Sequence, residues 1–507
     1  MEDACISLAR SIARQVELPR NIISPDIRRD SFSCSDDSDT ESINGPFSIF
    51  SKREKIFIAL VASLATLLPP LAGNIFYPVI ELIATDLDVS VNQINLTITG
   101  YLVVQGLAPS FIGNLSDTHG RRPALMLAFT IFIAGCLGAA FPGSYTMLVL
   151  MRCLQSAGSS GTVAIASAMV TDIVTSSQRG EYYSYVQLGA MVGPSLGPVI
   201  GGLVSHAWGW RSIFWFLTTL ATLIFILTIL FLPETSRKIV GNGSISAQSW
   251  NKPIFGRVVG VHKEMPKTRF NPFEALSLFF HLENFILLIY SGIIYSTQYY
   301  FFATLPLQFQ QHYGFTTVSI SLVFLATGFG TMLAVILVGR LQDWNFHRHA
   351  GKRGIVILSN KQQSLDGFPI EVARLQTTFP LLFLSLASLI AYGWLLQSTS
   401  PVGPIIMAFL WAAGNAAAFN GFGNLIVDLN RDHPGTATAS MNMSRNWIGA
   451  GVVAFSNPLT EGVGMGWANV IIVGYTLLLL PGVLFLYFRG HEWRRAAVER
   501  RTKSPQV

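Results

Sequence analysis

Two arginines lie within long apolar segments of the chain, where a charged side chain is costly. Arg152 and Arg445 each sit in a run that is long enough to cross a bilayer. An arginine at the centre of a membrane helix costs at least about 2.5–3.5 kcal/mol, so it persists where it faces protein or water and has a partner. The two arginines could therefore contact a substrate or influence a proton site, or they could anchor neighbouring helices through backbone carbonyls.

Acidic residues are missing from the middle of these apolar runs. Glu81 and Glu461 are expected near the outer ends of their helices, and Asp117 marks an end on the other side. No carboxylate is therefore placed to carry a proton near the membrane midplane, as in many pumps. The interior is left net positive, which suits an anionic substrate.

Uncharged polar and aromatic side chains within the runs could line a substrate or proton pathway. Most belong to the first, fourth, seventh and tenth runs, which are equivalent in an inverted three-plus-three repeat and surround the site in transporters of that design. For any single position, packing between helices is the alternative. With the two arginines, the set comprises Asn74, Tyr77, Arg152, Gln155, Tyr295, Gln298, Tyr299, Asn415, Asn442 and Arg445.

A charged turn separates two of the apolar runs and returns in weaker form in the second half of the chain. The first copy covers residues 113–123, and the second repeats its Gly-to-Asp spacing at residues 339–343. Glycine at both ends lets two helices reverse direction closely, and the acid with paired arginines predicts a charge cluster at the membrane surface. The expected members of this charge relay are Gly113, Asp117, Gly120, Arg121, Arg122 and Asp343.

The fifth run carries glycines four residues apart, which line one face of a helix and permit close backbone contact. Two Gly-Pro pairs in the same run also remove backbone donors and favour a bend. We therefore expect a closely packed, bent helix at the seam between two halves. Its residues are Gly189, Gly193, Pro194, Gly197, Pro198, Gly201 and Gly202.

The same run contains a formal match to the Gly-x-Ser-x-Gly pattern of hydrolases, centred on Ser195. That pattern needs a strand, a turn and a helix to expose the serine. Here the serine lies within a helical glycine period, and no base accompanies it in sequence. The motif therefore does not predict an enzyme.

Bulk composition indicates a membrane protein. The 507 residues are 50% hydrophobic and 12% charged, whereas soluble domains carry about 25% charged residues. The net charge of +6 is dispersed among loops, which does not favour nucleic-acid binding. The four cysteines predict no disulfide framework. No nucleotide-binding loop, zinc pattern or haem motif is present, so we expect no cofactor and no metal.

Twelve apolar runs of about the length of a membrane helix fall into two sets of six. The fold class expected is therefore an all-α membrane protein with twelve transmembrane helices in two pseudo-symmetric halves. The runs are 56–80, 92–114, 123–142, 145–171, 181–205, 211–232, 284–309, 317–341, 379–397, 402–427, 435–459 and 467–488. In both halves an Asp ends the fourth run and a Gly soon opens the next, at Asp172 and Asp428.

The regions between these runs define the domain organisation. A disordered cytosolic tail is expected at 1–50, a six-helix half at 51–232, a cytosolic linker at 233–283, a second half at 284–490 with a cytosolic loop at 342–378, and a basic tail at 491–507. No signal peptide is recognised in the first fifty residues. The Ser-rich acidic stretch within them is either a cluster of phosphorylation sites or a solvated linker.

The distribution of positive charge fixes the expected orientation. Of the 34 Lys and Arg residues, all but Arg152, Arg211 and Arg445 fall on the side shared by both termini. Because positive loops stay in the cytosol, we expect both termini and the linker there.

Several of these motifs resemble those of the major facilitator superfamily. Residues 113–123 match its loop motif between helices two and three, residues 152–158 resemble its helix-four motif, and residues 189–202 resemble the helix-five motif associated with antiporters. Residues 232–235, 368–375 and 437–446 look like the fungal branch of its twelve-helix drug:proton antiporters.

The resemblance implies alternating access, in which the two halves rock around a central site. It implies that Asp117 and Arg121 latch one state, that Arg152 takes part in proton coupling, and that the helix-five glycines serve the bend between states. Where relatives often carry an acid in helix one, this chain has Asn74 and Tyr77. Proton coupling is therefore expected from kinship alone.

The function expected is a secondary active exporter of drugs, toxins or secondary metabolites by proton antiport. An organic-acid exporter of the same fold and a non-transporting nutrient sensor are the alternatives. Expected partners are a small-molecule substrate, protons and membrane lipids, with no nucleic acid and a monomeric state. The expected location is the plasma membrane, or else the vacuolar membrane.

Overall fold

The computed structural model describes residues 48–245, 248, 251–254, 274–352, 368–430 and 434–503. The chain divides into two compact units, Met1–Pro46 and Phe47–Val507, and the described residues all belong to the second. The tail expected at 1–50 therefore falls almost wholly outside the described residues, as does the question of its phosphorylation.

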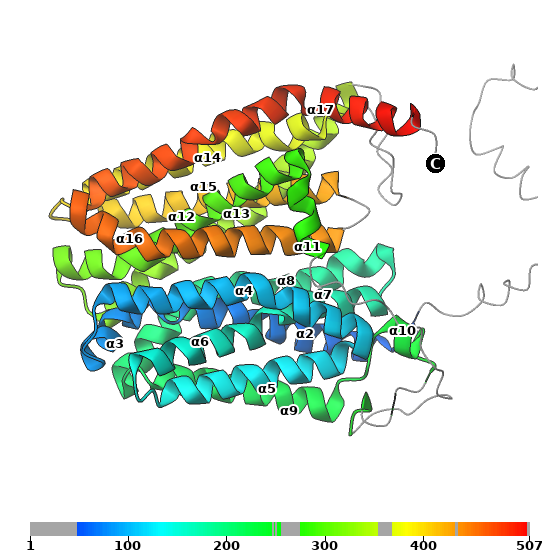
Figure 1. Cartoon of the computed structure of the whole chain (residues 1–507), viewed down its shortest axis with the longest axis horizontal. Coiled ribbons are helices and arrows are strands. Elements are labelled where there is room, and N and C mark those ends of the chain that lie inside the picture. Colours follow the sequence, from blue (N-terminus) through cyan, green and yellow to red (C-terminus); the bar gives the residue numbers. More distant parts are fainter. Residues whose placement is uncertain are drawn as a thin grey trace, which may run out of the picture. The chain divides into compact units, whose positions relative to one another are not determined.

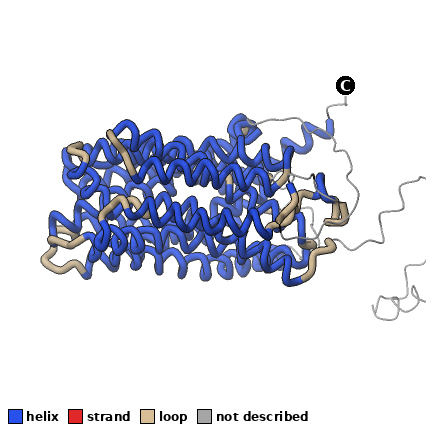
Figure 2. Tube along the Cα trace, turned by 90° about the horizontal axis from the view of Figure 1, so that it is seen from below, coloured by secondary structure: helices blue, strands red, loops and turns tan. Residues whose placement is uncertain are grey.

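The described part of the chain contains helices and connecting loops (Figure 2). The first half consists of α2 (Lys52–Asn74), η2 (Tyr77–Val79), α3 (Ile80–Asp86), α4 (Val91–His119), α5 (Arg121–Ala140), α6 (Tyr145–Ser160), α7 (Thr162–Ile173), α8 (Ser176–Trp208) and α9 (Ser212–Phe231). The linker contributes α10 (Arg237–Val240), α11 (Glu274–Ser277) and η4 (Leu278–Phe280). The second half consists of α12 (Leu282–Tyr313), α13 (Thr317–Lys352), α14 (Ile370–Leu395), α15 (Val402–Leu429), α16 (Pro434–Leu478) and α17 (Leu480–Lys503).

Local sequence explains where several helices begin and end. Ser51 accepts a hydrogen bond from the Glu54 N–H at 3.3 Å, and Glu54 accepts one from the Ser51 N–H at 2.7 Å, which forms a capping box at the start of α2. Ser90 and Gln93 form the same arrangement before α4. Gly314 ends α12 in the left-handed region, which glycine adopts without a steric penalty.

The expected twelve-helix architecture is confirmed. Ten helices of the described chain are long and apolar enough to cross a membrane. Residues 145–173 form one further span, which is divided at Gly161 into α6 and α7. The span counted as Gly435–Gly490 contains two crossings that meet at Gly464, where φ is 76°. The structure is therefore an all-α membrane protein with two six-helix halves.

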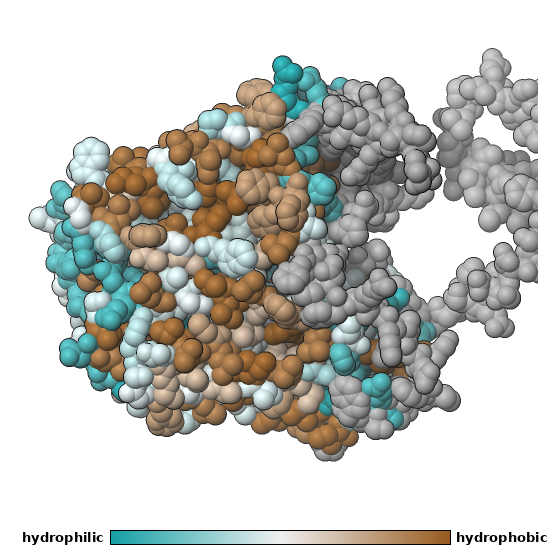
Figure 3. Space-filling model, in the orientation of Figure 1, coloured by the Kyte–Doolittle hydropathy of each residue, from teal (hydrophilic) through white to brown (hydrophobic). Residues whose placement is uncertain are grey.

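The outer surface agrees with this assignment. The face in Figure 3 is mainly apolar over the helices, with hydrophilic residues gathered at its left edge. Large apolar side chains such as Phe329, Leu337 and Phe455 are exposed there or elsewhere on the helices. Exposed apolar side chains in such numbers indicate contact with lipid rather than with water.

Helices extend into two of the regions expected outside the apolar runs. Within the cytosolic loop expected at 342–378, α13 continues to Lys352 and α14 already begins at Ile370. Gln342 and Asn345 are buried in the extension of α13, so these polar residues pack against protein and the helix continues past the apolar run. The basic tail expected from residue 491 is likewise helical as far as Lys503, since α17 continues through it.

We call the end of the helices that carries α10 and the α4–α5 turn the linker side, and the other end, with the turn between α3 and α4, the opposite side (Figure 1). Within each half the helices pack pairwise, as α2 does on α8 and α14 on α15. Between the halves, α4 packs on α16 and α8 packs on α13. The two halves therefore meet along these two pairs of helices.

Candidate functional site

Arg152 lies on α6 and is fully buried. Its Nη1 donates to the Gln155 Oε1 at 2.6 Å and to the Ala72 carbonyl at 3.2 Å. The guanidinium stands 4.5 Å from the centre of the Phe76 ring and 4.4 Å from that of Tyr101, which stabilises its charge through cation–π attraction. Its Nε and Nη2 have no hydrogen-bond partner among the described residues.

Gln155 holds one side of this arginine. It is fully buried one turn beyond Arg152, and its Nε2 donates to the Cys136 Sγ at 3.0 Å. Residues three positions apart lie on the same face of a helix. The three-residue spacing of Arg152 and Gln155 therefore brings their side chains into contact. Gln155 therefore fixes the orientation of the guanidinium and leaves part of its donors free.

Arg445 lies on α16, in the other half, and is partly exposed. Its guanidinium stands 4.9 Å from the centre of the Tyr295 ring. Its Nε is buried without a hydrogen-bond partner in the described structure. Among the described residues no carboxylate forms an ion pair with Arg445 or with Arg152.

Tyrosines of both halves lie near the two arginines. Tyr77, on η2, is within electrostatic range of both Arg152 and Tyr295. Tyr299 is within range of Arg445 and Tyr77, and its ring lies 5.1 Å from that of Tyr295. Tyr295 and Tyr299 therefore lie beside Arg445, and the phenol of Tyr77 is the aromatic group that the first half contributes toward them.

The remaining expected pathway residues lie around this site with differing roles. Tyr299 donates its hydroxyl to the Asn446 Oδ1 at 2.8 Å, and Asn446 in turn donates to Asn442. The Thr297 hydroxyl donates to Asn415 at 3.1 Å, so Asn415 is engaged between α12 and α15. Asn446 was not in the expected pathway set, although it directly follows Arg445 in the 437–446 motif.

Asn74 and Gln298 show less specific placement. Asn74 Nδ2 donates to the Pro70 carbonyl of its own helix at 2.6 Å, where it satisfies a backbone group next to two prolines. Gln298 is partly exposed on α12. The other eight pathway residues form hydrogen bonds or ring contacts beyond their own backbone turn. Neither Asn74 nor Gln298 makes a described contact with either arginine.

The two halves contact each other at the middle and on the opposite side. Asn442 Nδ2 donates to the Gln105 carbonyl at 3.3 Å, and Thr99 donates to the Ala450 carbonyl at 3.2 Å. The rings of Tyr77 and Phe302 lie 5.7 Å apart. The described contacts therefore close the opposite side more than the linker side.

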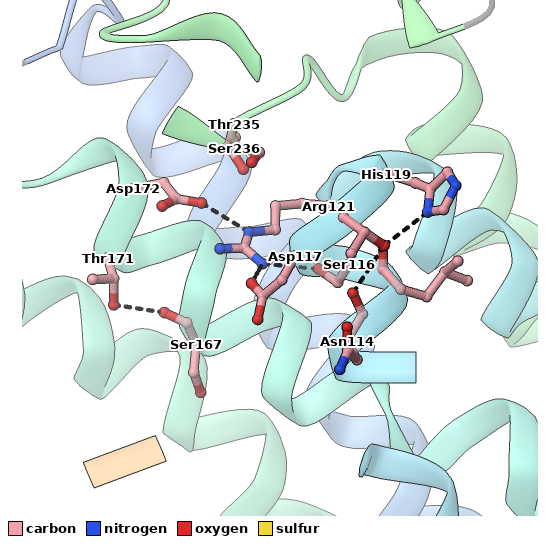
Figure 4. Close-up of polar contacts among 12 residues, drawn as sticks. Asn114, Ser116, Asp117, His119, Arg121, Ser167, Thr171, Asp172, Thr235 and Ser236 are labelled. Carbon is pink, nitrogen blue, oxygen red and sulfur yellow. Dashed lines mark hydrogen bonds and ion pairs between the residues drawn. The ribbon is translucent and has the colours of Figure 1, made fainter. Parts of the chain in front are cut away.

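The α4–α5 turn brings together three of the expected members of the charge relay, Asp117, Gly120 and Arg121. Arg121, at the start of α5, donates from Nε to Asp172 of α7 at 2.9 Å and is also paired with Asp117 of α4 (Figure 4). Its Nη1 donates to Ser116 at 3.1 Å. Gly120 takes φ of 110°, where a side chain would be strained, so it makes the turn possible. Asp117 stays half-exposed and remains available on the linker side.

Glu234 is a central member of this cluster that sequence reasoning did not identify. It is buried, and it accepts from the N–H groups of Arg121 and Arg122, from those of Thr235 and Ser236, and from Asn251. A carboxylate at the first N–H groups of a helix also complements the helix dipole. Glu234 therefore fastens the linker to the start of α5. The only signal for it was its place in the 232–235 motif.

Arg122 has a structural role in the same place. Its side chain is buried, and its Nη2 donates to the Ile229 carbonyl at the end of α9 at 2.9 Å. Gly113 lies on α4 one turn before Asp117, with open space where a Cβ would be. Both residues lie at the cluster. Among the described residues, Arg122 forms no ion pair with Asp117 or Asp172.

The structure does not bring Asp343 into an equivalent cluster. Asp343 is exposed on α13, and only its backbone carbonyl takes part in a described hydrogen bond, with His347. The counterpart in the second half is instead the pair formed by Arg374 Nε and the Asp428 carboxylate at 2.9 Å. Residues 339–343 lie within α13 rather than at a turn. Arg374 comes from near the start of the next helix, α14, as Arg121 comes from the start of α5.

The helix-five glycines let α8 lie against α2. A Cβ added at Gly189, Gly193, Gly197 or Gly201 would collide with, or press closely on, atoms of Ser63, Pro70, Leu71, Asn74 and Ile75. Gly202 instead faces Ser321 of α13, in the other half. Helix α8 is therefore packed between α2 and α13, and Pro194 and Pro198 lie inside one continuous helix.

Ser195 has no hydrolase surroundings. It lies inside α8, and its side chain faces Gly328 of α13. No group of three His, Cys, Asp or Glu residues in the described part of the chain could hold a metal ion.

Comparison with known proteins decides the family. The sequence profile of the Major Facilitator Superfamily matches residues 62–454. The chain belongs to the Major Facilitator Superfamily. The MFS-type transporter phiD of Fungal sp. (strain ATCC 74256) is 39% identical over 471 residues, covering 90% of this chain and 72% of that protein. Citrate exporter 1 of Aspergillus niger is 33% identical over 476 residues, covering 90% of each.

A solved structure supports the same fold. The partially occluded inward-open form of the xylose transporter XylE from E. coli aligns with a TM-score of 0.60 at 15% identity, over 86% of this chain and 97% of that chain. The expected family and fold are thus confirmed, and the protein is a multi-pass membrane transporter of a fungal type. Its relatives are named as transporters, which agrees with the expectation that it is not an enzyme.

Proposed function

We propose that this Major Facilitator Superfamily protein exports small organic molecules, such as drugs, toxins or secondary metabolites, by alternating access. The observation that carries the proposal is the central site, where Arg152 and Arg445 come from different halves and each guanidinium stands over aromatic rings. Tyr77 of the first half also packs on Phe302 of the second, with 5.7 Å between the ring centres. A substrate held between residues of both halves is released when the halves separate. Aromatic side chains and buried donors together suit an organic molecule with an apolar body and a polar group.

The charge cluster serves this cycle as a latch. In the state described, contacts between the halves are concentrated at the middle and on the opposite side, and Asp117 is half-exposed on the linker side. We propose that rocking brings this carboxylate against the start of the second half, while Arg121 and Asp172 keep the turn in shape. The close packing of α8 against α2 and α13 then transmits the motion.

Proton antiport is the coupling mechanism that the resemblance implies, and it stays a prediction. It is tested with the full chain reconstituted in proteoliposomes loaded with a lipophilic cation, rhodamine 6G. Efflux that follows a pH gradient and collapses with a protonophore supports a drug:proton antiporter. Saturable efflux that does not depend on the pH gradient would support the export function but contradict proton antiport. Ligand-dependent signalling without any flux would instead favour a nutrient sensor.

Organic-acid export is the second candidate function. Two buried or half-buried arginines without an ion-pair partner favour it, because the site is positive as a whole. One relative at 33% identity is named a citrate exporter. Dicarboxylate efflux from the same proteoliposomes tests this function directly.

The remaining expectations concern placement in the cell. We propose a monomer in the plasma membrane, or alternatively the vacuolar membrane, with both termini and the linker in the cytosol. The positive charge of the linker side supports this orientation. Cysteine labelling of intact cells at an engineered site in the turn after α3 and at one in the linker tests it, since only the first should react.

A further inference from the structure

We infer that the substrate is an organic dianion, and that its own charge in the membrane potential drives export without proton exchange. This inference rests on the proposed export function and names its substrate class. It departs from the coupling that the family resemblance implies.

The centre of the membrane region contains two fixed positive charges and no acid. Arg152 and Arg445 are the charged side chains at the centres of the described spanning helices, while Glu81, Glu461, Asp172 and Asp428 lie toward helix ends. Lysine and histidine are likewise absent from these centres. Two uncompensated charges in a low-dielectric region are expensive, so an anion that binds there gains from both.

No group at the site is suited to carry a proton near neutral pH. An arginine does not release its proton in a protein. The other titratable groups that face Arg152 are Tyr77, Tyr101, Cys136 and Cys153, and those that face Arg445 are Tyr295 and Tyr299. Phenols and thiols are neutral at pH 7. Proton antiport therefore lacks a carrier at the place where substrate binds.

Unused donors point to the chemistry of the ligand. Arg152 is fully buried, yet its Nε and Nη2 are without partners, while Nη1 is fixed by Gln155 and Ala72. The buried Nε of Arg445 is also without a partner. A carboxylate accepts two parallel hydrogen bonds from one guanidinium. One carboxylate on each arginine satisfies these donors and neutralises the site.

The two arginines differ in access, which gives the order of binding. Arg445 is partly exposed and stands over the Tyr295 ring, so it makes the first contact with an anion from the linker side. Arg152 lies deeper, between Phe76 and Tyr101, and engages the second carboxylate as the halves rock. The tyrosines and Phe419, whose ring is 4.7 Å from that of Tyr295, favour an aromatic or otherwise flat body between the carboxylates.

The membrane potential supplies the driving force for this cargo. In a cell that is negative inside, 100 mV favours outward movement of one negative charge by about 50-fold in concentration ratio and of two charges by about 2,000-fold. The arginines stay in the protein and return with it. Each cycle therefore moves two negative charges outward and no proton inward.

The test uses the full chain in proteoliposomes with radiolabelled phthalate, at equal pH on both sides and with the potential set by potassium and valinomycin. Each change of about 60 mV should alter the final phthalate ratio about 100-fold, and that of its monomethyl ester about 10-fold. A pH gradient at zero potential, or a protonophore at clamped potential, should leave both ratios unchanged.

The outcomes separate this inference from the proposed function. Rhodamine 6G efflux without phthalate efflux would contradict the dianion substrate but still support the proposed export function. Phthalate efflux that follows a pH gradient at zero potential overturns the inference as well. Failure to move either compound overturns both proposals.

Matched variants test the residues. Arg445→Gln should raise the KM for phthalate about 10- to 100-fold, because charge-assisted hydrogen bonds are lost, and should abolish the rise in Tm that phthalate causes. Arg445→Lys should recover part of both effects, since the charge is kept. Arg211→Gln is the control, because Arg211 pairs with Asp86 on the opposite side at 2.8 Å. Unchanged phthalate affinity in folded Arg445→Gln would contradict the assignment.

Discussion

Arg374 Nε donates to the Asp428 carboxylate at 2.9 Å, on the linker side of the second half. In the first half, Arg121 makes the same contact with Asp172 at the same distance. Each half thus ties the start of its third spanning helix to the end of its fourth. The internal repeat is therefore preserved in these ion pairs, although the surrounding turns differ.

The Arg374–Asp428 pair should contribute measurably to stability. Both side chains are largely buried, and Arg374 also stands 5.1 Å from the centre of the Phe346 ring. Arg374→Gln should lower the free energy of unfolding by about 1–3 kcal/mol, seen as a lower Tm in detergent. Arg489→Gln is the control, since the Arg489–Glu492 pair is exposed and should be worth nothing measurable. Equal Tm values for the two variants would contradict this prediction.

Glu234 should be essential for the α4–α5 turn. Glu234→Ala leaves several buried donors without an acceptor, each costing about 1–3 kcal/mol. We expect a large loss of folded protein and a lower Tm, measured by size-exclusion chromatography and thermal unfolding. Glu181→Ala serves as the comparison, because Glu181 is exposed and its carboxylate bonds only to Tyr185 in the described structure. A wild-type Tm for Glu234→Ala would show that the linker is not fastened in this way.

Gly201 should tolerate no larger side chain. A Cβ there collides with the carbonyl of Ile75, which is backbone and cannot move aside cheaply. Gly201→Val should therefore separate α8 from α2, lower the Tm and reduce efflux at least about 10-fold, as overpacking typically costs about 1–3 kcal/mol. Gly474→Val tests the specificity of this effect, because a Cβ at Gly474 meets open space. Normal efflux by Gly201→Val would reject close packing as the reason for the glycine.

Arg152 should not be replaceable by lysine. Its planar guanidinium lies against two aromatic rings while it donates to Gln155 and Ala72, and an ammonium cannot reproduce this geometry. Arg152→Lys should fold with a modestly lower Tm and lose at least about 10-fold in initial efflux rate, consistent with the loss of one or two charge-assisted hydrogen bonds. Wild-type rates with lysine would mean that charge alone is needed at this position.

Ser195 should be dispensable for transport. The serine packs on Gly328 inside a helix and has no hydrolase context. Ser195→Ala should leave the Tm close to that of the wild type and the initial efflux rate within about 2-fold of it. The reason is that removing one hydroxyl at a packed site without special contacts has a small effect. Esterase activity in the purified protein that disappears in this variant would revive the hydrolase hypothesis.

The sequence predicted the helices well because lipid imposes a simple rule on them. Every backbone polar group must be satisfied within the span, so an apolar run of sufficient length can only be a helix. The expected runs at 92–114 and 402–427 correspond to α4 and α15 with only small differences. The same rule does not apply beyond the membrane, which is why α13 and α17 continued past their expected ends.

The sequence by itself determined the number of spans, the repeat, the two lone arginines and the glycine face of α8. These features follow from hydrophobicity and from fixed helical spacing. Only the tertiary structure decided that Glu234 caps α5, that Arg374 pairs with Asp428 while Asp343 stays exposed, and that Tyr77 of the first half packs on Phe302 of the second. These contacts join residues far apart in the chain, and their geometry depends on how whole helices pack rather than on any local pattern.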